Sequence, residues 1–188
     1  VFVVLALICV DAGRLGEAQS IGVFAAATLG FIPFNFPRAR VFMGDVGSGV
    51  IGLLVVIAIG WQIAAVPALW VAGLIACSAF VVDSTATLLS RMFSGRRWYN
   101  AHREHLYQWL VRCGFSHAKV TGFYMLWNLL IVVPALLCLR DSVAAGSQNA
   151  IEAGSILAGV YALALLTWVA GKRYCLGSSM AALRKRVP

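Results

Sequence analysis

The sequence predicts an all-α protein, a polytopic transmembrane helical bundle with about five full spans after a truncated first one. Composition is the first reason, because 61% of the 188 residues are hydrophobic and only 12% are charged. A soluble domain is nearer half apolar and a quarter charged. The second reason is that the apolar residues form runs close to the roughly 20 residues that a helix needs to cross a bilayer. Open sheets cannot span lipid, so we expect helices.

The apolar runs place the expected spans in order along the chain. They cover residues 1–10, 18–34, 47–62, 67–90, 120–139 and 152–171. Residues 46–82 carry no charge, and Trp61, Gln62 and Pro67 mark a short turn between two spans. The first run begins at Val1 and shows no signal-peptide features. We therefore expect residues 1–188 to form a single transmembrane domain, within a fragment whose start lies inside a helix.

Basic residues predict which ends of the spans share a side. Thirteen of the fifteen lysines and arginines fall in loops 35–46 and 91–119 and in the C-terminal tail, while Arg14 and Arg140 lie in the intervening loops. Lysine and arginine accumulate on the cytoplasmic side of membrane proteins. Loops 35–46 and 91–119 and the tail are therefore expected to be cytoplasmic.

Charge and cysteine content disfavour two classes of protein. The net charge of +8 is better explained by a cytoplasmic membrane face and phosphate ligands than by nucleic acid, which we do not expect as a partner. The five cysteines show no CxxC spacing, which argues against a disulfide framework or a zinc site.

The most informative segment, residues 41–48, reads VFMGDVGS and places one carboxylate, Asp45, in a glycine-rich turn between apolar segments. Arg38 and Arg40 come just before it. An Asp beside backbone N–H groups and arginines suits a magnesium-bound phosphate. A solvated interfacial loop, in which Asp and Gly merely end a helix, explains the spacing equally well.

Two neighbouring side chains suit a nucleotide. Asn35 has an amide that can donate and accept hydrogen bonds at once, as reading a base edge requires, and Phe42 offers a ring for stacking. The alternatives are a helix C-terminal residue before Pro37 and an interfacial aromatic ring.

A second polar segment, residues 96–108, reads RRWYNAHREHLYQ. His102 and His105 share a helical face, Arg103 lies between them, and Arg96 and Arg97 lie upstream. Arginine forks suit pyrophosphate oxygens, and histidine can hydrogen-bond phosphate or relay a proton. The alternative is a membrane-surface amphipathic helix that holds anionic headgroups. Two histidines and one glutamate make a weak metal site.

Asp83 lies inside the apolar run 67–90, where a carboxylate is a candidate functional residue. Arg91 follows eight residues later on a similar helical face. We expect a structural role for Asp83, or one behind the site itself.

Together these segments resemble the polyprenyl-phosphate N-acetylhexosamine-1-phosphate transferases, the MraY- and WecA-like enzymes of glycosyltransferase family 4. Residues 35–48 are similar to the family pattern that runs from an asparagine to FMGD-x-GS. Residues 100–115 are similar to its cytoplasmic histidine loop, with Arg103 and His105 retained. Tyr107 and Gln108 replace two histidines, a form closest to the WbpL-like branch.

The resemblance covers only the C-terminal half of the family. The acidic Asp-Asp-x-x-Asp motif of these enzymes is absent and would lie upstream of Val1. This implies that the chain is the C-terminal part of a larger enzyme and is inactive alone.

The resemblance implies a phosphoglycosyl transferase. It would move an N-acetylhexosamine-1-phosphate from a UDP-sugar to undecaprenyl phosphate, release UMP, and initiate O-antigen or other cell-envelope polysaccharide synthesis. The implied location is the bacterial inner membrane, with a multi-pass chain, membrane lipid as surroundings and an active site facing the cytoplasm. Assembly as a homodimer is compatible with this class.

The resemblance also implies residue roles. Asp45 would hold Mg²⁺, or Mn²⁺ in its place, and Asp45, Arg103 and His105 would be the catalytic residues. Phe42 and Asn35 would bind the nucleotide. The remaining phosphate contacts would come from Arg96, Arg97 and His102.

Two other classes remain open at this point, a secondary transporter fragment and a non-catalytic membrane scaffold. A transporter would explain the helices, Asp83 and the cytoplasmic charge. It would not explain why Asn35, Asp45 and His105 are all expected on one face.

Overall fold

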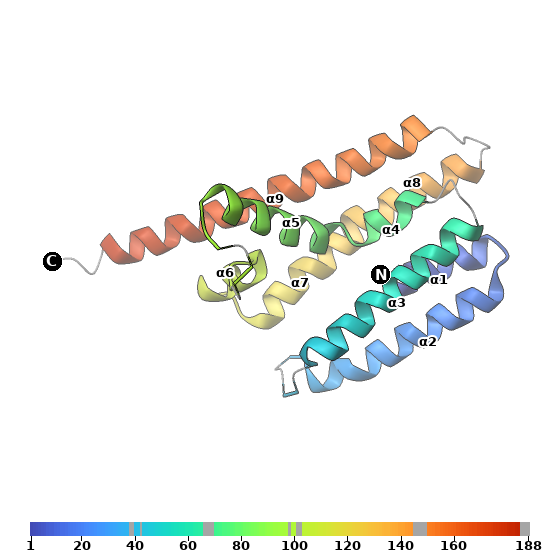
Figure 1. Cartoon of the computed structure of the whole chain (residues 1–188), viewed down its shortest axis with the longest axis horizontal. Helices are drawn as coiled ribbons and strands as arrows, with labels where there is room; N and C mark the ends of the chain where they lie inside the picture. The colour runs from blue at the N-terminus through green and yellow to red at the C-terminus, as the bar shows by residue number, and fades with distance from the viewer. Residues whose placement is uncertain are drawn as a thin grey trace.

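The computed structural model describes residues 1–188 apart from 38–39, 42, 66–69, 98, 101–102, 145–149 and 185–188. The side chains of residues 45, 65, 70, 143–144, 150 and 178–184 also lie outside the description. The described chain is a bundle of helices (Figure 1). The all-α fold class expected from the apolar runs is confirmed.

Within the described residues, four helical segments are long and apolar enough to cross a membrane. The first joins α2 (Leu15–Phe31) to the 3₁₀ turn η1 (Ile32–Phe34), and the second is α3 (Gly44–Ala65). The third joins α7 (His117–Trp127), the π-helical turn η3 (Asn128–Val132) and α8 (Val133–Ala144). The fourth is α9 (Ala150–Arg184). Before them stands the short apolar helix α1 (Phe2–Asp11).

The expected span 67–90 is not one continuous helix in the described part of the chain. A turn at Cys77 separates α4 (Trp70–Ala76) from α5 (Ser78–Phe93). Hydropathy could not reveal this break, because Cys77 is itself apolar and the two pieces are contiguous. Gly73 lets α4 approach Ile59 of α3, where a Cβ atom would lie 2.4 Å from the Ile59 side chain, and both α4 and α5 pack along α9.

The interior and the surface of the bundle have the polarity expected in lipid. Leu5, Ile21 and Ile75 are fully buried between helices, and the buried Gln62 amide donates to the Leu5 carbonyl oxygen at 2.8 Å. On the outside, Val56 and Leu166 are about two-thirds exposed. A helix with such an apolar outer surface is suited to contact with acyl chains.

The helix ends fall at two opposite sides of the bundle (Figure 1). The junctions of α2 with α3 and of α5 with α6 (Leu106–Arg112), together with the C-terminal part of α9, lie at the left of the view. The α1–α2 turn, the end of α8 and the start of α9 lie at the right. This is the alternation that the basic loops predicted, because Arg96 belongs to the α5–α6 connection and Lys172 to the C-terminal half of α9.

Candidate functional site

The α2–α3 turn owes its shape to two glycines of the VFMGDVGS segment. Gly44 has a φ of +69°, a left-handed conformation that favours glycine. Gly47 lies under the Met43 side chain, where a Cβ atom would come within 2.3 Å of Met43 Cγ. The turn therefore starts α3 at Gly44 and places Asp45 in its first turn. The free backbone N–H groups of a first turn attract anions such as phosphate.

The neighbouring expected nucleotide residues are only partly described. Asn35 follows η1, and its amide donates to the Phe31 carbonyl oxygen at a long 3.4 Å. Phe42 and Arg38 lie outside the described residues, as does the side chain of Asp45. Their expected roles remain predictions.

The buried face of α5 is polar. Ser78, Asp83, Thr87 and Arg91 recur at helical spacing and are buried, whereas Phe80 and Leu89 on the outer face are exposed. A buried charge needs partners. As expected from their spacing, Asp83 and Arg91 share this face, and each forms hydrogen bonds with polar partners.

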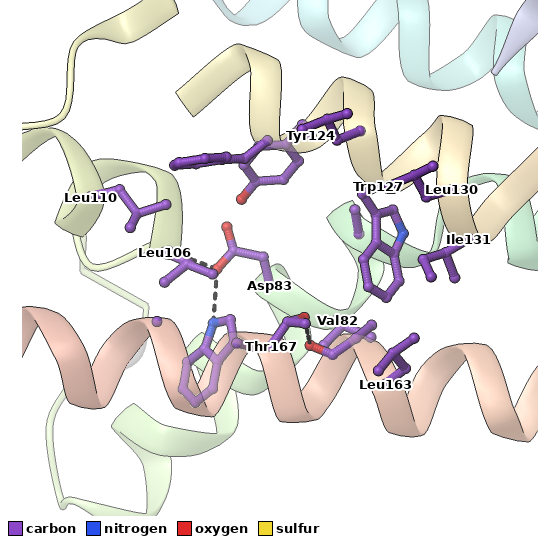
Figure 2. Close-up of a pocket in the computed structure, with 16 residues that line it drawn as sticks. Val82, Asp83, Leu106, Leu110, Tyr124, Trp127, Leu130, Ile131, Leu163 and Thr167 are labelled. Carbon is purple, nitrogen blue, oxygen red and sulfur yellow. Dashed lines mark hydrogen bonds between the residues drawn. The ribbon is translucent and has the colours of Figure 1, made fainter. Parts of the chain in front are cut away.

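Asp83 holds the start of α6 against α5 and α9. Its Oδ1 accepts from the backbone N–H of Leu106 at 2.8 Å, from the Trp168 indole at 3.0 Å and from the Thr87 hydroxyl at 3.3 Å. The Tyr124 hydroxyl also points toward this carboxylate (Figure 2). These partners give Asp83 the structural role that was expected for it.

His105 is the residue that precedes α6, and its side chain accepts from the backbone of Gln108 in a capping box. Its Nδ1 lies 3.7 Å from Asp83 Oδ2, and its ring stacks on Tyr107 at a centroid distance of 5.8 Å and 14°. Its backbone N–H donates to Gln108 Oε1 at 3.3 Å. Gln108 Nε2 in turn donates to the Tyr107 hydroxyl at 3.2 Å. The two residues that replace family histidines therefore pack around the histidine that remains.

The arginines of the α5–α6 connection divide into paired and unpaired groups. Glu104 accepts from the buried Arg91 at 2.7 Å and from Arg96 at 3.0 Å. Arg97 and Arg103 are exposed, and no ion pair is recorded for either among the described residues. Arg97 and Arg103 are thus available to an anionic ligand, whereas Arg96 must share its charge with Glu104. His102 lies outside the described residues.

Three residues beside this cluster were not singled out from the sequence. Glu104 lacks any motif that marks it as the partner of two arginines. The indole of Trp168 donates to Asp83 at 3.0 Å. Lys172 lies 4.6 Å from the Trp168 ring centroid, one helical turn closer to the basic end. Only the short spacing of Trp168 and Lys172 on one face of α9 could have suggested that they act together.

A cavity of about 430 Å³ lies beside Asp83 and Leu106, between α5, α6, α7, η3 and α9. Its walls are apolar or aromatic, with Leu110, Trp127 and Leu163 among them, and Asp83 and Tyr124 are at its polar end (Figure 2). Gly171 lets α6 close this end, because a Cβ atom there would lie 2.9 Å from the Leu106 side chain.

Asp45 is the residue expected to hold magnesium, together with substrate phosphates. In the described part of the chain, no three His, Cys, Asp or Glu residues come together as metal ligands. Mg²⁺ commonly keeps several waters and is held by one or two carboxylates together with substrate phosphates. A single aspartate at position 45, beside the open first turn of α3, is compatible with that mode.

The α2–α3 turn and the α6 cluster lie at the same end of the bundle (Figure 1). The hydrogen bonds recorded for Asn35 stay within its own turn and do not reach α6. The structure therefore brings the two expected parts of the site to one side, but not into direct contact through Asn35.

Comparison with known proteins shows that part of this chain is similar to a known family. The model of glycosyl transferase family 4 matches residues 1–63. The resemblance predicted from the motifs is confirmed. The family segment contains Asn35, Gly44 and Asp45, and so includes the whole α2–α3 turn.

Three mycobacterial proteins are similar to part of this chain. A decaprenyl-phosphate N-acetylglucosaminephosphotransferase of Mycobacterium tuberculosis is 34% identical over 120 residues, covering 56% of this chain and 29% of the relative. Those of Mycobacterium leprae and Mycolicibacterium smegmatis are 32% identical over 120 residues and 34% identical over 128 residues. They cover 56% and 60% of this chain, and 30% and 31% of the respective relatives. The chain thus spans about three tenths of the relatives' length. No solved structure matches significantly.

Proposed function

We propose that the protein is a phosphoglycosyl transferase of the cell envelope. A phosphate oxygen of a polyprenyl phosphate attacks the β-phosphorus of a UDP-N-acetylhexosamine. The new P–O bond forms as the bond between the β-phosphorus and the bridging oxygen breaks, and UMP leaves with that oxygen. The product is a lipid-linked sugar pyrophosphate, and free UMP is released.

The observation that carries this proposal is the α2–α3 turn in the family segment. Gly44 is left-handed and Gly47 lies close to the Met43 side chain. The turn that they form places Asp45 in the first turn of a membrane-spanning helix. Left-handed glycines also occur in other turns of the chain, at Gly13, Gly95 and Gly114. The feature that supports the proposal is the combination of Gly44, Gly47 and Asp45 at the start of α3. The basic residues of the α5–α6 connection at the same end, Arg97 and Arg103 among them, supply the positive charge that two polyanionic substrates require.

The side chains divide the work as follows. Asn35 and Phe42 bind the uridine part, by base-edge hydrogen bonds and by stacking. Arg103 and His105 contact the diphosphate or the lipid phosphate, with Arg97 and His102 beside them. Arg96 contributes less, because Glu104 already pairs with it at 3.0 Å.

Asp45 is the residue that would hold Mg²⁺, or Mn²⁺ in its place. Such an ion supplies charge neutralisation on the diphosphate when it is bound. The protein's own part is to hold the nucleotide and to gather basic side chains around the two phosphates.

The substrates and the cellular setting are part of the same proposal. The M. tuberculosis relative is named for decaprenyl phosphate and N-acetylglucosamine. We propose undecaprenyl phosphate as the carrier here, a role at the start of O-antigen or related polysaccharide synthesis, and kinship with the WbpL-like branch. The basic end of the bundle would face the cytoplasm from the bacterial inner membrane.

The test is transfer of radiolabelled sugar from UDP-N-acetylglucosamine, and from its deoxy N-acetyl analogues, into lipid extracts. Membranes containing the full-length protein receive undecaprenyl or decaprenyl phosphate and Mg²⁺. Asp45→Asn should abolish nearly all transfer while the protein still accumulates, and Asp141→Asn, an exposed change at the opposite end, serves as the matched control. Near-normal transfer by Asp45→Asn with unchanged magnesium dependence would exclude the proposed ligand.

A further inference from the structure

Lys172 is a cation within a membrane-spanning helix, and the proposed division of roles gives it no part. It belongs to α9 and lies inside the span Ile151–Gly177, at the end of the bundle where the α5–α6 connection is found (Figure 1). Its side chain is partly buried, whereas the next residue, Arg173, is exposed. A charged side chain within a span is costly and is therefore a candidate functional residue.

A fixed aromatic ring determines where the Lys172 ammonium group lies. Its Nζ is 4.6 Å from the centroid of the Trp168 ring, within the range of a cation–π contact. The ring is itself held, because the Trp168 indole N–H donates to Asp83 Oδ1 at 3.0 Å. Gly171, just before Lys172, packs against the Leu106 side chain of α6. Lys172 is therefore held close to the start of α6.

The charges around Lys172 leave an excess that suits an anion. Glu104, Asp83 and Arg96 are the charged groups that act on it. Glu104 already accepts from Arg91 at 2.7 Å and from Arg96 at 3.0 Å, and for Lys172 no ion pair is recorded among the described residues. Three cations therefore share two carboxylates, and the remaining positive charge favours an anionic ligand.

Depth in the membrane distinguishes the two polyanions of the proposed reaction. Arg97 and Arg103 lie outside the spans, in the exposed connection between α5 and α6, whereas Lys172 lies inside one. A UDP-sugar is water-soluble and arrives from the aqueous side, but the phosphate of a lipid is tethered to the bilayer by its hydrocarbon chain. Trp168, which carries the Lys172 contact, also lines the apolar cavity of about 430 Å³. The cation thus adjoins a surface that suits hydrocarbon.

We propose that Lys172 binds the phosphate of the polyprenyl phosphate and leaves Arg97 and Arg103 to the UDP-sugar. This inference rests on the proposed function, because that function supplies the lipid phosphate. The charge of the ligand suits the site: a phosphate monoester carries about 1.5 to 2 negative charges at pH 7, whereas the diester of a bulk phospholipid carries one. Trp168 is a positioning residue, since it acts through Lys172.

Lys172→Gln tests this contact, and Arg173→Gln is the matched control because it removes the same charge from the exposed neighbouring position. Full-length protein in an uncharged detergent is assayed against varied undecaprenyl phosphate, and then against varied UDP-N-acetylglucosamine. Lys172→Gln should raise the KM for the lipid about 10- to 100-fold, the range for losing a hydrogen bond to a charged group. The KM for the UDP-sugar should change less than threefold. Lys172→Arg, which keeps the charge and can stack on the same ring, should have the milder effect.

The second readout does not depend on transfer. Retention of radiolabelled undecaprenyl phosphate by the purified full-length protein gives a Kd, which is measured with and without excess phosphatidylglycerol. We expect Lys172→Gln to weaken binding about 10-fold or more and Arg173→Gln to change it less than threefold. Phosphatidylglycerol should compete poorly. Equally good competition by this diester lipid would show that Lys172 holds only a general membrane headgroup, and would overturn the assignment.

The two readouts separate failure of this inference from failure of the proposed function. A wild type that transfers no sugar, yet binds undecaprenyl phosphate through Lys172, contradicts the proposed function and supports the lysine contact. An active wild type whose Lys172→Gln variant changes KM and Kd no more than Arg173→Gln overturns the contact. So does a larger rise in the KM for the UDP-sugar than in that for the lipid. A wild type that neither transfers sugar nor binds the lipid overturns both.

Discussion

Arg103 and Tyr107 are close in sequence but differ in what they offer a substrate. Arg103 is exposed and without a recorded ion pair in the described chain, whereas Tyr107 stacks on His105. We expect Arg103→Ala to lower the transfer rate far more than Tyr107→Phe, because a charge-assisted contact to phosphate contributes more than a neutral one and phenylalanine keeps the stack. Gln108→Ala should also be mild.

Initial rates at saturating magnesium measure this series in the full-length protein. Equal losses at Arg103, Tyr107 and Gln108 would show that our division of roles is wrong. So would a rate gain from placing histidines at both 107 and 108, since we expect those positions to support His105 and not to replace it.

Phe42 provides a separate residue-scale prediction. If its ring stacks on uracil, Phe42→Ala should weaken UMP binding by about 1–3 kcal/mol, the usual contribution of a base stacked on an aromatic side chain. Competition of UMP against the labelled UDP-sugar measures this directly, with Phe36→Ala as the control for loss of a nearby aromatic ring. If UMP competes equally well in both variants, Phe42 is a packing residue.

Single residues were predictable where their chemistry conflicts with their surroundings. A carboxylate in an apolar run marked Asp83, and helical spacing placed Arg91 on the same face. The partners were not predictable. Leu106 and Trp168 are 23 and 85 residues away from Asp83 along the chain, and composition and spacing report only on near neighbours. Glu104 was missed for the same reason.

At the scale of elements, α6 is seven residues long and too short to be stable by itself. Asp83 holds its first N–H group, and Gly171 allows Leu106 to pack on α9. We expect Asp83→Ala to destabilise α6 by roughly 0.5–2 kcal/mol, the range for loss of a helix cap, and more if the Trp168 indole loses its partner.

Hydrogen–deuterium exchange of residues 106–112 measures this effect in the full-length protein. Exchange there should accelerate in Asp83→Ala, stay close to wild type in Thr87→Val, and be unchanged in α3 in both variants. Uniform acceleration across all helices would instead show global destabilisation, and unchanged protection of α6 would show that Asp83 does not hold it.

The helices were predictable to different degrees. Long apolar runs correctly predicted α2, α3, α7 to α8, and α9, because a bilayer requires this length and composition. The break at Cys77 could not be predicted, because Cys77 is apolar and the two helices are contiguous in sequence. Asp83 indicated from the sequence that α5 has a polar face. How deeply that face is buried depends on the other helices and could not be predicted.

For the whole molecule, the two ends of the bundle should lie on opposite sides of the membrane. Ser94 follows α5 at the basic end, and Asp141 is exposed near the end of α8 at the other. In a version free of the five native cysteines, a cysteine at 141 should react with an impermeant reagent from outside the cell, because the basic end is expected inside. A cysteine at 94 should react only after the membrane is opened. The reverse pattern would overturn the orientation.

The central claim is that phosphorus moves together with the sugar. Full-length protein in membranes is given UDP-N-acetylglucosamine labelled with ³²P at either the β- or the α-phosphorus, together with undecaprenyl phosphate. The account predicts that β-label enters the lipid fraction in proportion to sugar, while α-label leaves as UMP. Sugar entering the lipid without β-label, with UDP as the nucleotide product, would contradict it.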